Sequence, residues 1–106
     1  MKKINNVNDF NEIIKTDNLT VAKFSAEWCG PCRQLASTID SIENNYDNVN
    51  FIEIDVDDTN NDEIVSDYNI RNIPVLIFFK NNEVLERSVG SIDKVTLNNK
   101  IDKFLS

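Results

Sequence analysis

The sequence has no histidine, and among its 106 residues it holds only two cysteines, two glycines, two prolines and one tryptophan. Without histidine, two cysteines cannot supply the four Cys or His ligands of a zinc site within one chain. We therefore expect no metal site, although half of a zinc site shared between two chains remains an alternative.

Basic residues are also few: eleven Lys and Arg against eighteen Asp and Glu give a net charge of −7. That sign disfavours nucleic acid and anionic membrane surfaces as partners. No apolar run approaches transmembrane length, and the first residues, Met1 to Asn6, lack the apolar core of a signal peptide. We therefore expect a cytoplasmic monomer, with one domain spanning residues 1–106.

Both cysteines lie in one stretch, Trp28-Cys29-Gly30-Pro31-Cys32. The residues before it predict a strand over 19–25, and apolar residues at helical spacing after it predict a helix over about 31–46. Cys29 then lies where the strand ends and the helix begins. The helix N-terminus favours the thiolate of Cys29 over the thiol, which makes it reactive near neutral pH. A purely structural disulfide is the weaker alternative, because it would close too short a loop to constrain the unfolded chain much.

Further helices are predicted from possible N-caps followed by apolar residues at helical spacing. Asn8 is expected to cap a short first helix that ends near residues 16–18. Thr59 is expected to cap a third helix, and Asp93 a last helix whose apolar residues mostly share one face. Those apolar residues are Val95, Leu97, Ile101, Phe104 and Leu105.

Strands are predicted over residues 51–56, 75–79 and 83–89. The segment from Val75 to Phe79 is the most continuous apolar run, which is typical of a central strand covered on both faces. Asn81-Asn82 is a two-residue hairpin signal, so the last two strands should be antiparallel.

The stretch from Ala26 to Cys32 resembles the active site of the thioredoxin family, and the similarity extends from about Phe10 to Leu105. Ile73-Pro74 before one strand and Gly90 after the last match, in order and spacing, the family's cis-proline loop and glycine loop. The resemblance implies an α/β thioredoxin fold, with a central mixed five-stranded sheet flanked by four helices. It also implies a protein-disulfide reductase that binds no cofactor, because the dithiol is itself the redox centre.

The resemblance assigns roles to residues at the matching positions. Cys29 would be the attacking nucleophile and Cys32 the resolving thiol. The substrate groove would be formed by Trp28, Gly30, Pro31, Ile73, Pro74 and Gly90. Core packing is the alternative role for Trp28, and a break at a sheet edge is the alternative for Pro74.

Two charges depart from the family pattern. Most thioredoxins carry a buried carboxylate six residues before the first cysteine and a lysine on the neighbouring strand, whereas this chain has Lys23 and Glu53 at those positions. Because an unpaired buried charge is costly, we expect the two to form a largely buried ion pair, the alternative being two solvated charges. Glu53 would then take or give the proton of the buried cysteine, and Lys23 would hold Glu53 ionised.

Two serines also depart from the pattern. Ser37 stands where many relatives have a proline that kinks the active-site helix, so we expect an uninterrupted helix. Ser25 stands where relatives often carry an aromatic residue, so we expect looser packing behind Trp28.

The leading hypothesis is a cytoplasmic thiol-disulfide oxidoreductase that reduces protein disulfides and receives electrons from an external thioredoxin reductase of unknown type. The donor would be a flavoprotein using a nicotinamide, ferredoxin or another carrier. The alternative is a redox-controlled binding module or subunit that docks through the apolar rim around the cysteines. An oxidant or isomerase is a third hypothesis.

Overall fold

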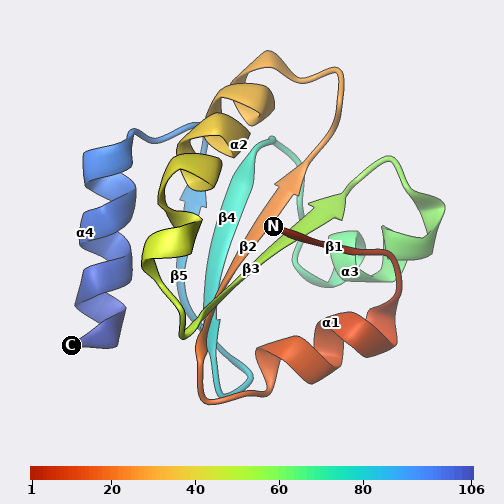
Figure 1. Cartoon of the computed structure of the whole chain (residues 1–106). Helices are drawn as coiled ribbons and strands as arrows, with labels where there is room; N and C mark the ends of the chain where they lie inside the picture. Colours follow the sequence, from red (N-terminus) through yellow and green to blue (C-terminus); the bar gives the residue numbers. More distant parts are fainter.

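A computed structural model describes residues 1–106 and shows one mixed sheet with the strand order β1-β3-β2-β4-β5 (Figure 1). β1 and β2 both run parallel to β3, whereas β4 is antiparallel to β2 and to β5. The strands are β1 (Lys2–Ile4), β2 (Leu19–Ser25), β3 (Val49–Asp55), β4 (Val75–Lys80) and β5 (Glu83–Val89).

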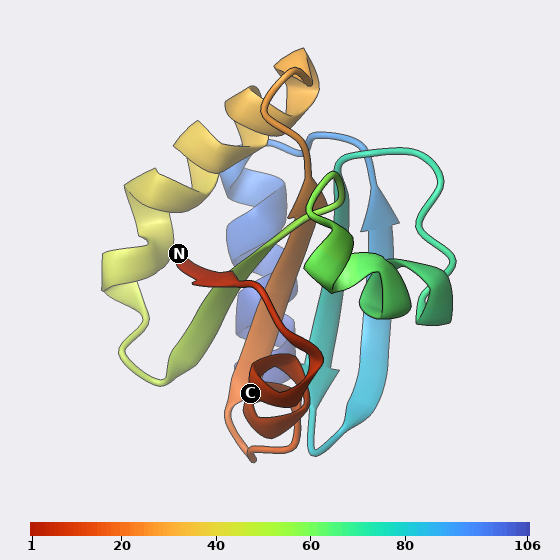
Figure 2. The ribbon, with the colours of Figure 1, turned by 90° about the vertical axis from the view of Figure 1, so that its right-hand side faces the viewer.

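Four α-helices cover the two faces of the sheet, so the fold implied by the resemblance is confirmed (Figure 2). α2 and α4 pack on one face, and α1 and α3 pack on the other. The helices are α1 (Val7–Ile14), α2 (Gly30–Ile42), α3 (Asp62–Asp67) and α4 (Lys94–Leu105), with short 3-10 helices η1 (Glu43–Asn45) and η2 (Thr59–Asn61).

The core forms two layers, one on each side of the central strand β4. Leu76 and Phe78 pack with α2 and α4, while Ile77 and Phe79 pack with α1 and α3. All four are at most 1 % exposed. The prediction of a central strand covered on both faces is therefore confirmed.

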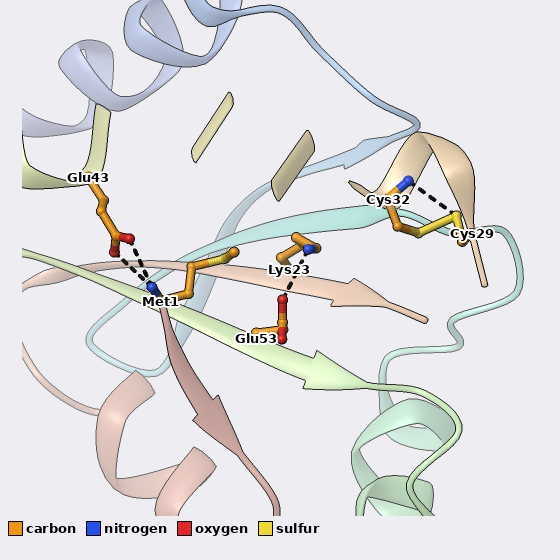
Figure 3. Close-up of polar contacts among 6 residues, drawn as sticks. All are labelled: Met1, Lys23, Cys29, Cys32, Glu43 and Glu53. Carbon is orange, nitrogen blue, oxygen red and sulfur yellow. Dashed lines mark hydrogen bonds and ion pairs between the residues drawn. A yellow bond between two sulfur atoms is a disulfide. The ribbon is translucent and has the colours of Figure 1, made fainter. Parts of the chain in front are cut away.

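β1 was not predicted from its residues, because only Ile4 of its three residues is buried and so no alternation is visible. Its place at the sheet edge, paired with β3 alone, makes it the fifth strand. Next to it, the Met1 ammonium contacts both carboxylate oxygens of Glu43 at 2.9 and 3.0 Å (Figure 3).

Two predicted caps were wrong. The first helix is capped by Asn6, not Asn8, because the Asn6 side chain accepts from the Asp9 N–H at 2.8 Å. Thr59 begins η2, which Asp58 caps by accepting from the Asn60 N–H, and the α-helix follows it.

The boundaries of three elements also differ from the predictions. α1 ends at Ile14, before the predicted end near residues 16–18. The active-site helix ends as an α-helix at Ile42 and continues as the 3-10 helix η1. β3 begins at Val49, two residues before the predicted start. In α4, whose predicted cap Asp93 is confirmed, Val95 is 68 % exposed and so lies off the buried face.

The β4–β5 turn is the predicted two-residue turn, with Asn81 and Asn82 at φ of 52° and 67°. The backbone N–H groups of these two residues donate to the carbonyls of Thr16 and Ile14, at 2.9 and 2.7 Å. The hairpin turn thus supplies one hydrogen-bond donor to the last residue of α1 and one to the loop after it, on the far side of the molecule from the cysteines (Figure 1).

Candidate active site

Cys29 and Cys32 form a disulfide at the start of α2, with Cα atoms 5.2 Å apart. Cys29 is the N-cap of the helix, and its Sγ accepts from the Cys32 backbone N–H at 3.2 Å (Figure 3). Pro31 occupies the first turn, where its missing N–H breaks no intrahelical bond. The helix therefore directs its positive end at the sulfur of Cys29.

The two sulfurs differ in access. Cys29 is 5 % exposed and Cys32 is 1 % exposed. The Cys29 Sγ also lies 4.0 Å from the carbonyl oxygen of Ile73, in the loop before β4. Cys29 is thus the sulfur nearer to solvent and to that loop, and Cys32 lies beneath it.

The loop before β4 and the loop after β5 meet beside the cysteines. The peptide bond between Ile73 and Pro74 is cis, and the carbonyl of Pro74 accepts from the Gly90 N–H at 2.8 Å. Gly90 has a φ of 94°, which favours glycine. A side-chain carbon at Gly90 would meet no atom within 4 Å, so the space beside this loop is open.

Pro74 precedes a strand that lies between two others, so it does not mark a sheet edge.

Trp28 projects from the protein beside the disulfide. It is 70 % exposed, so core packing is excluded as its role. Its indole Nε1 donates to a carboxylate oxygen of Asp57 at 2.7 Å, which holds the ring in place. Asp57 was not among the predicted site residues, and its sequence position just after β3 carries no signal for this contact.

The predicted ion pair beneath the cysteines is present. Lys23 and Glu53 are register partners on the parallel strands β2 and β3, and Lys23 Nζ lies 3.1 Å from Glu53 Oε2 (Figure 3). The two ends differ in exposure, at 3 % for the Lys23 side chain and 23 % for that of Glu53. The lysine is therefore buried as predicted, while the carboxylate reaches a surface.

That surface is the wall of a pocket of about 440 Å³. Lys23, Glu53 and Cys32 all line it, and so does Ser25 at the end of β2. The pocket thus joins the ion pair to the buried cysteine, with space for water between them.

The structure also tests one of the serine expectations. α2 runs without interruption from Gly30 to Ile42 through Ser37, as expected without a proline. Ser25 is 5 % exposed. The expectation of looser packing behind Trp28 stays a prediction.

The predicted groove residues gather around the disulfide, and most of them reach the surface. Trp28, Gly30 and Pro31 are exposed, Ile73 and Gly90 are half-buried, and Pro74 is buried. Nowhere do three or more His, Cys, Asp or Glu side chains gather so that they could hold a metal ion. The arrangement offers one redox-active pair beside an uncharged surface, with an ion pair behind it.

Comparison with known proteins matches residues 1–103 to the family model for thioredoxin. The chain is 35 % identical over 96 residues to a thioredoxin of Porphyra purpurea, covering 90 % of this chain and 88 % of the relative. It is 37 % identical over 95 residues to thioredoxin 1 of Synechococcus elongatus, covering 89 % of this chain and 87 % of the relative. Among solved structures, a Plasmodium falciparum thioredoxin matches with a TM-score of 0.87 at 29 % identity, over 98 % of this chain and 99 % of the other.

Proposed function

The chain belongs to the thioredoxin family and is a disulfide oxidoreductase, and we propose that it reduces protein disulfides with Cys29 as nucleophile and Cys32 as resolving thiol. The observation that carries these roles is the contact between the Cys32 N–H and Cys29 Sγ, at 3.2 Å. A hydrogen bond from a helix N-terminus favours the anionic form of the sulfur that receives it, and here that sulfur is the more accessible one.

The reaction follows from this difference in access between the two sulfurs. The Cys29 thiolate attacks one sulfur of a substrate disulfide, so that a mixed disulfide forms and the other substrate sulfur leaves as a thiolate. Cys32, as its thiolate, then attacks Cys29 Sγ and releases the second substrate thiolate. The substrate gains two electrons, the protein dithiol loses two, and the leaving thiolates take up protons.

The substrate groove supports a broad specificity. Trp28, Gly30 and Pro31 form one wall, and Ile73, Pro74 and Gly90 form the other. None of these six residues carries a charge, so contacts to them depend on shape and on backbone groups rather than on one particular side chain of the substrate.

Glu53 is proposed to exchange the proton of Cys32 through water in the pocket that both residues line. Cys32 must lose its proton before it can attack, and it regains one when the protein is reduced again. Lys23, held 3.1 Å from Glu53, positions the carboxylate. Glu53→Gln should therefore slow resolution of a trapped mixed disulfide at neutral pH, and Lys23→Met should slow it less. Unchanged resolution in both variants would remove this role.

The roles of the two cysteines are tested by single substitutions. We expect Cys32→Ser to accumulate a mixed disulfide with a substrate protein and Cys29→Ser to form none, as read by mass spectrometry without reductant. Catalysed insulin reduction should be lost in both variants. If Cys29→Ser instead trapped the substrate, the two roles would be reversed.

The electron source is proposed to be an external thioredoxin reductase, because the chain's redox centre is a dithiol that must be reduced again after each cycle.

We propose a cytoplasmic location, where glutathione and related systems keep thiols reduced. Some relatives are chloroplastic, such as thioredoxin M-type of Spinacia oleracea. No helix of the structure has both the length and the apolar character needed to span a membrane. Fractionation of the source cells would test the location.

A redox-controlled binding module is the second candidate, favoured by the exposed indole of Trp28 beside the apolar loops. The double variant Cys29→Ser/Cys32→Ser separates the two functions. A biological effect that survives in this variant depends on binding, and one that is lost depends on electron transfer.

The direction of electron flow is tested by the reduction potential of the cysteine pair. We expect a value of roughly −270 mV, typical of a reductant, from equilibration with a thiol buffer while Trp28 fluorescence is read. A value of roughly −180 to −120 mV would instead indicate an isomerase or an oxidant.

A further inference from the structure

The negative charge of the chain is concentrated in one segment. Residues 50–70 contain seven acidic residues and no basic one, which equals the whole net charge of −7. The rest of the chain holds eleven acidic and eleven basic residues. This segment includes all of β3 but its first residue, together with η2 and α3. Its first loop lies beside the loop between β2 and α2 (Figure 1).

Four carboxylates lie at the junction of these two loops and form what we call the acidic rim: Glu27, Asp55, Asp57 and Asp58. Glu27, Asp55 and Asp57 line a hollow together with Trp28. Asp58 lines the adjoining pocket with Glu27 and Asp55. The rim thus borders the exposed indole.

No basic side chain of the chain forms an ion pair with the acidic rim. None of its four carboxylates is in an ion pair, and Glu53 is the only acidic residue of the segment that is. Three basic residues, Lys3, Lys23 and Arg33, line the 440 Å³ pocket with part of the rim. Lys23 is paired with Glu53, Arg33 donates to the backbone carbonyl of Glu27 at 2.7 Å, and Lys3 is in no ion pair. The rim therefore presents carboxylates without ion-pair partners beside Trp28.

Trp28 adds a second feature that attracts a cation. Its ring is 70 % exposed, and its hydrogen bond to Asp57 fixes the ring and places a negative charge at its edge. A Lys or Arg side chain over the face of a tryptophan is stabilised by the ring quadrupole. Neighbouring carboxylates strengthen this attraction and steer a basic partner during its approach.

We propose that the disulfides this chain reduces most rapidly carry Lys or Arg close to the bond, on the side that faces Trp28. The acidic rim selects these partners by attracting a basic side chain and repelling an acidic one, while the uncharged groove accepts the backbone around the disulfide. This inference rests on the proposed function and adds the class of substrate.

The probe is a matched set of short peptides whose single cysteine carries a neutral hydroxyethyl disulfide and is flanked by Lys, Gln or Glu. Single-turnover oxidation of the pre-reduced chain is followed by Trp28 fluorescence. At low ionic strength the Lys peptide should react about tenfold faster than the Glu peptide, with the Gln peptide between them. In about 1 M salt, where the Debye length is about 3 Å, the ratio should fall close to one.

The test variant replaces the acidic rim by amides, as Glu27→Gln/Asp55→Asn/Asp57→Asn/Asp58→Asn. Amide oxygens still accept the rim's hydrogen bonds from Trp28, Asp57 and Asn60, so the fold is kept. The matched control makes the same change of net charge at exposed acidic residues at or near α1 and on or after α2, as Glu12→Gln/Asp17→Asn/Asp40→Asn/Asp47→Asn.

We expect the Lys-to-Glu rate ratio to fall to about one in the rim variant and to persist in the control. Equal rates for the two peptides in the unmodified chain would overturn the inference, as would a faster Glu peptide. A preference that survives in the rim variant, or is lost equally in the control, would also overturn it. Failure of the proposed function gives a different result, because then the neutral Gln peptide would not be reduced either.

Discussion

Two lysine-carboxylate clusters connect neighbouring elements of this fold, one inside it and one at its surface. Lys23 and Glu53 join β2 to β3 next to the pocket that Cys32 lines. Glu86 of β5 contacts Lys100 and Lys103 of α4, at the opposite edge of the sheet. The side chain of Lys23 is 3 % exposed, whereas those of Lys100 and Lys103 are 26 % and 59 % exposed.

The comparison shows that the same chemical pair has different consequences in different surroundings. A surface charge that loses its partner is solvated by water, so an exposed pair contributes little to stability. A buried charge that loses its partner cannot be solvated, so breaking a buried pair is costly even where the intact pair contributes little. Removing either Lys23 or Glu53 should therefore destabilise the fold by leaving the other charge without a partner. Because both residues line the pocket that Cys32 lines, such a change also alters the surroundings of the redox site.

The largest effect is expected from Glu53→Gln, which leaves the buried ammonium of Lys23 without a counter-charge. The free energy of unfolding should fall by about 3 kcal/mol, measured by urea denaturation of the oxidised protein. Adding Lys23→Met to this variant should recover part of the loss, because the uncompensated charge is then removed. A double variant less stable than Glu53→Gln alone would contradict this account.

A smaller effect is expected from Lys23→Met alone. The methionine fills the space of the lysine stem, and the remaining carboxylate of Glu53 is 23 % exposed and can be hydrated from the pocket. The free energy of unfolding should fall by about 1 kcal/mol, in the same denaturation experiment. A loss as large as that of Glu53→Gln would show that the two ends of the pair are equally desolvated.

The smallest effect is expected at the surface pair, from Glu86→Gln. Hydrogen bonds from Lys100 and then Lys103 lower the pKa of Glu86 below its usual value of 4.5. Because the folded-state pKa is the lower one, the stabilisation is complete above the unfolded-state pKa and is lost as pH falls through the folded-state pKa. The variant should cost about 0.5–1 kcal/mol at pH 7 and progressively less in acid, measured by thermal melts across pH. A cost that does not change with pH would mean that packing, not charge, is lost.

Much of this architecture could be predicted from the sequence where one local pattern decides it. The run from Val75 to Phe79 is buried on both faces because every side chain in it is apolar. The Asn81-Asn82 turn follows from the tolerance of asparagine for positive φ. The pairing of Lys23 with Glu53 could be predicted because each charge interrupts an apolar strand, and the family fold places these two strands side by side.

The errors arose where two local choices were nearly equal in energy. Asn6 and Asn8 are both good caps, and the choice depends on Asp9, which both donates its N–H to Asn6 and accepts from the Asn6 amide. Asp58 and Thr59 are adjacent caps of the same kind, and the intervening 3-10 helix has no sequence signature.

Two long-range contacts for which neither the local sequence nor the family pattern gave a signal were beyond prediction. The hydrogen bond between Trp28 and Asp57 connects loops 29 residues apart, and neither residue's neighbours indicate it. β1 has too few residues for a pattern, and its position depends on pairing with β3. These parts of the site are fixed by tertiary packing rather than by local sequence.

The hairpin turn that donates a hydrogen bond to the end of α1 also affects when this helix is completed during synthesis of the chain. A helix ends with carbonyls that need partners. The carbonyl of Ile14, the last residue of α1, accepts from the N–H of Asn82, which is synthesised long after the helix itself. The first helix leaves the ribosome early but reaches its final hydrogen bonding only when the hairpin has formed. The chain therefore closes its fold through contacts distant in sequence, a topology that slows folding relative to local pairing. A nascent or truncated chain that stops before the turn leaves the end of its first helix open to water.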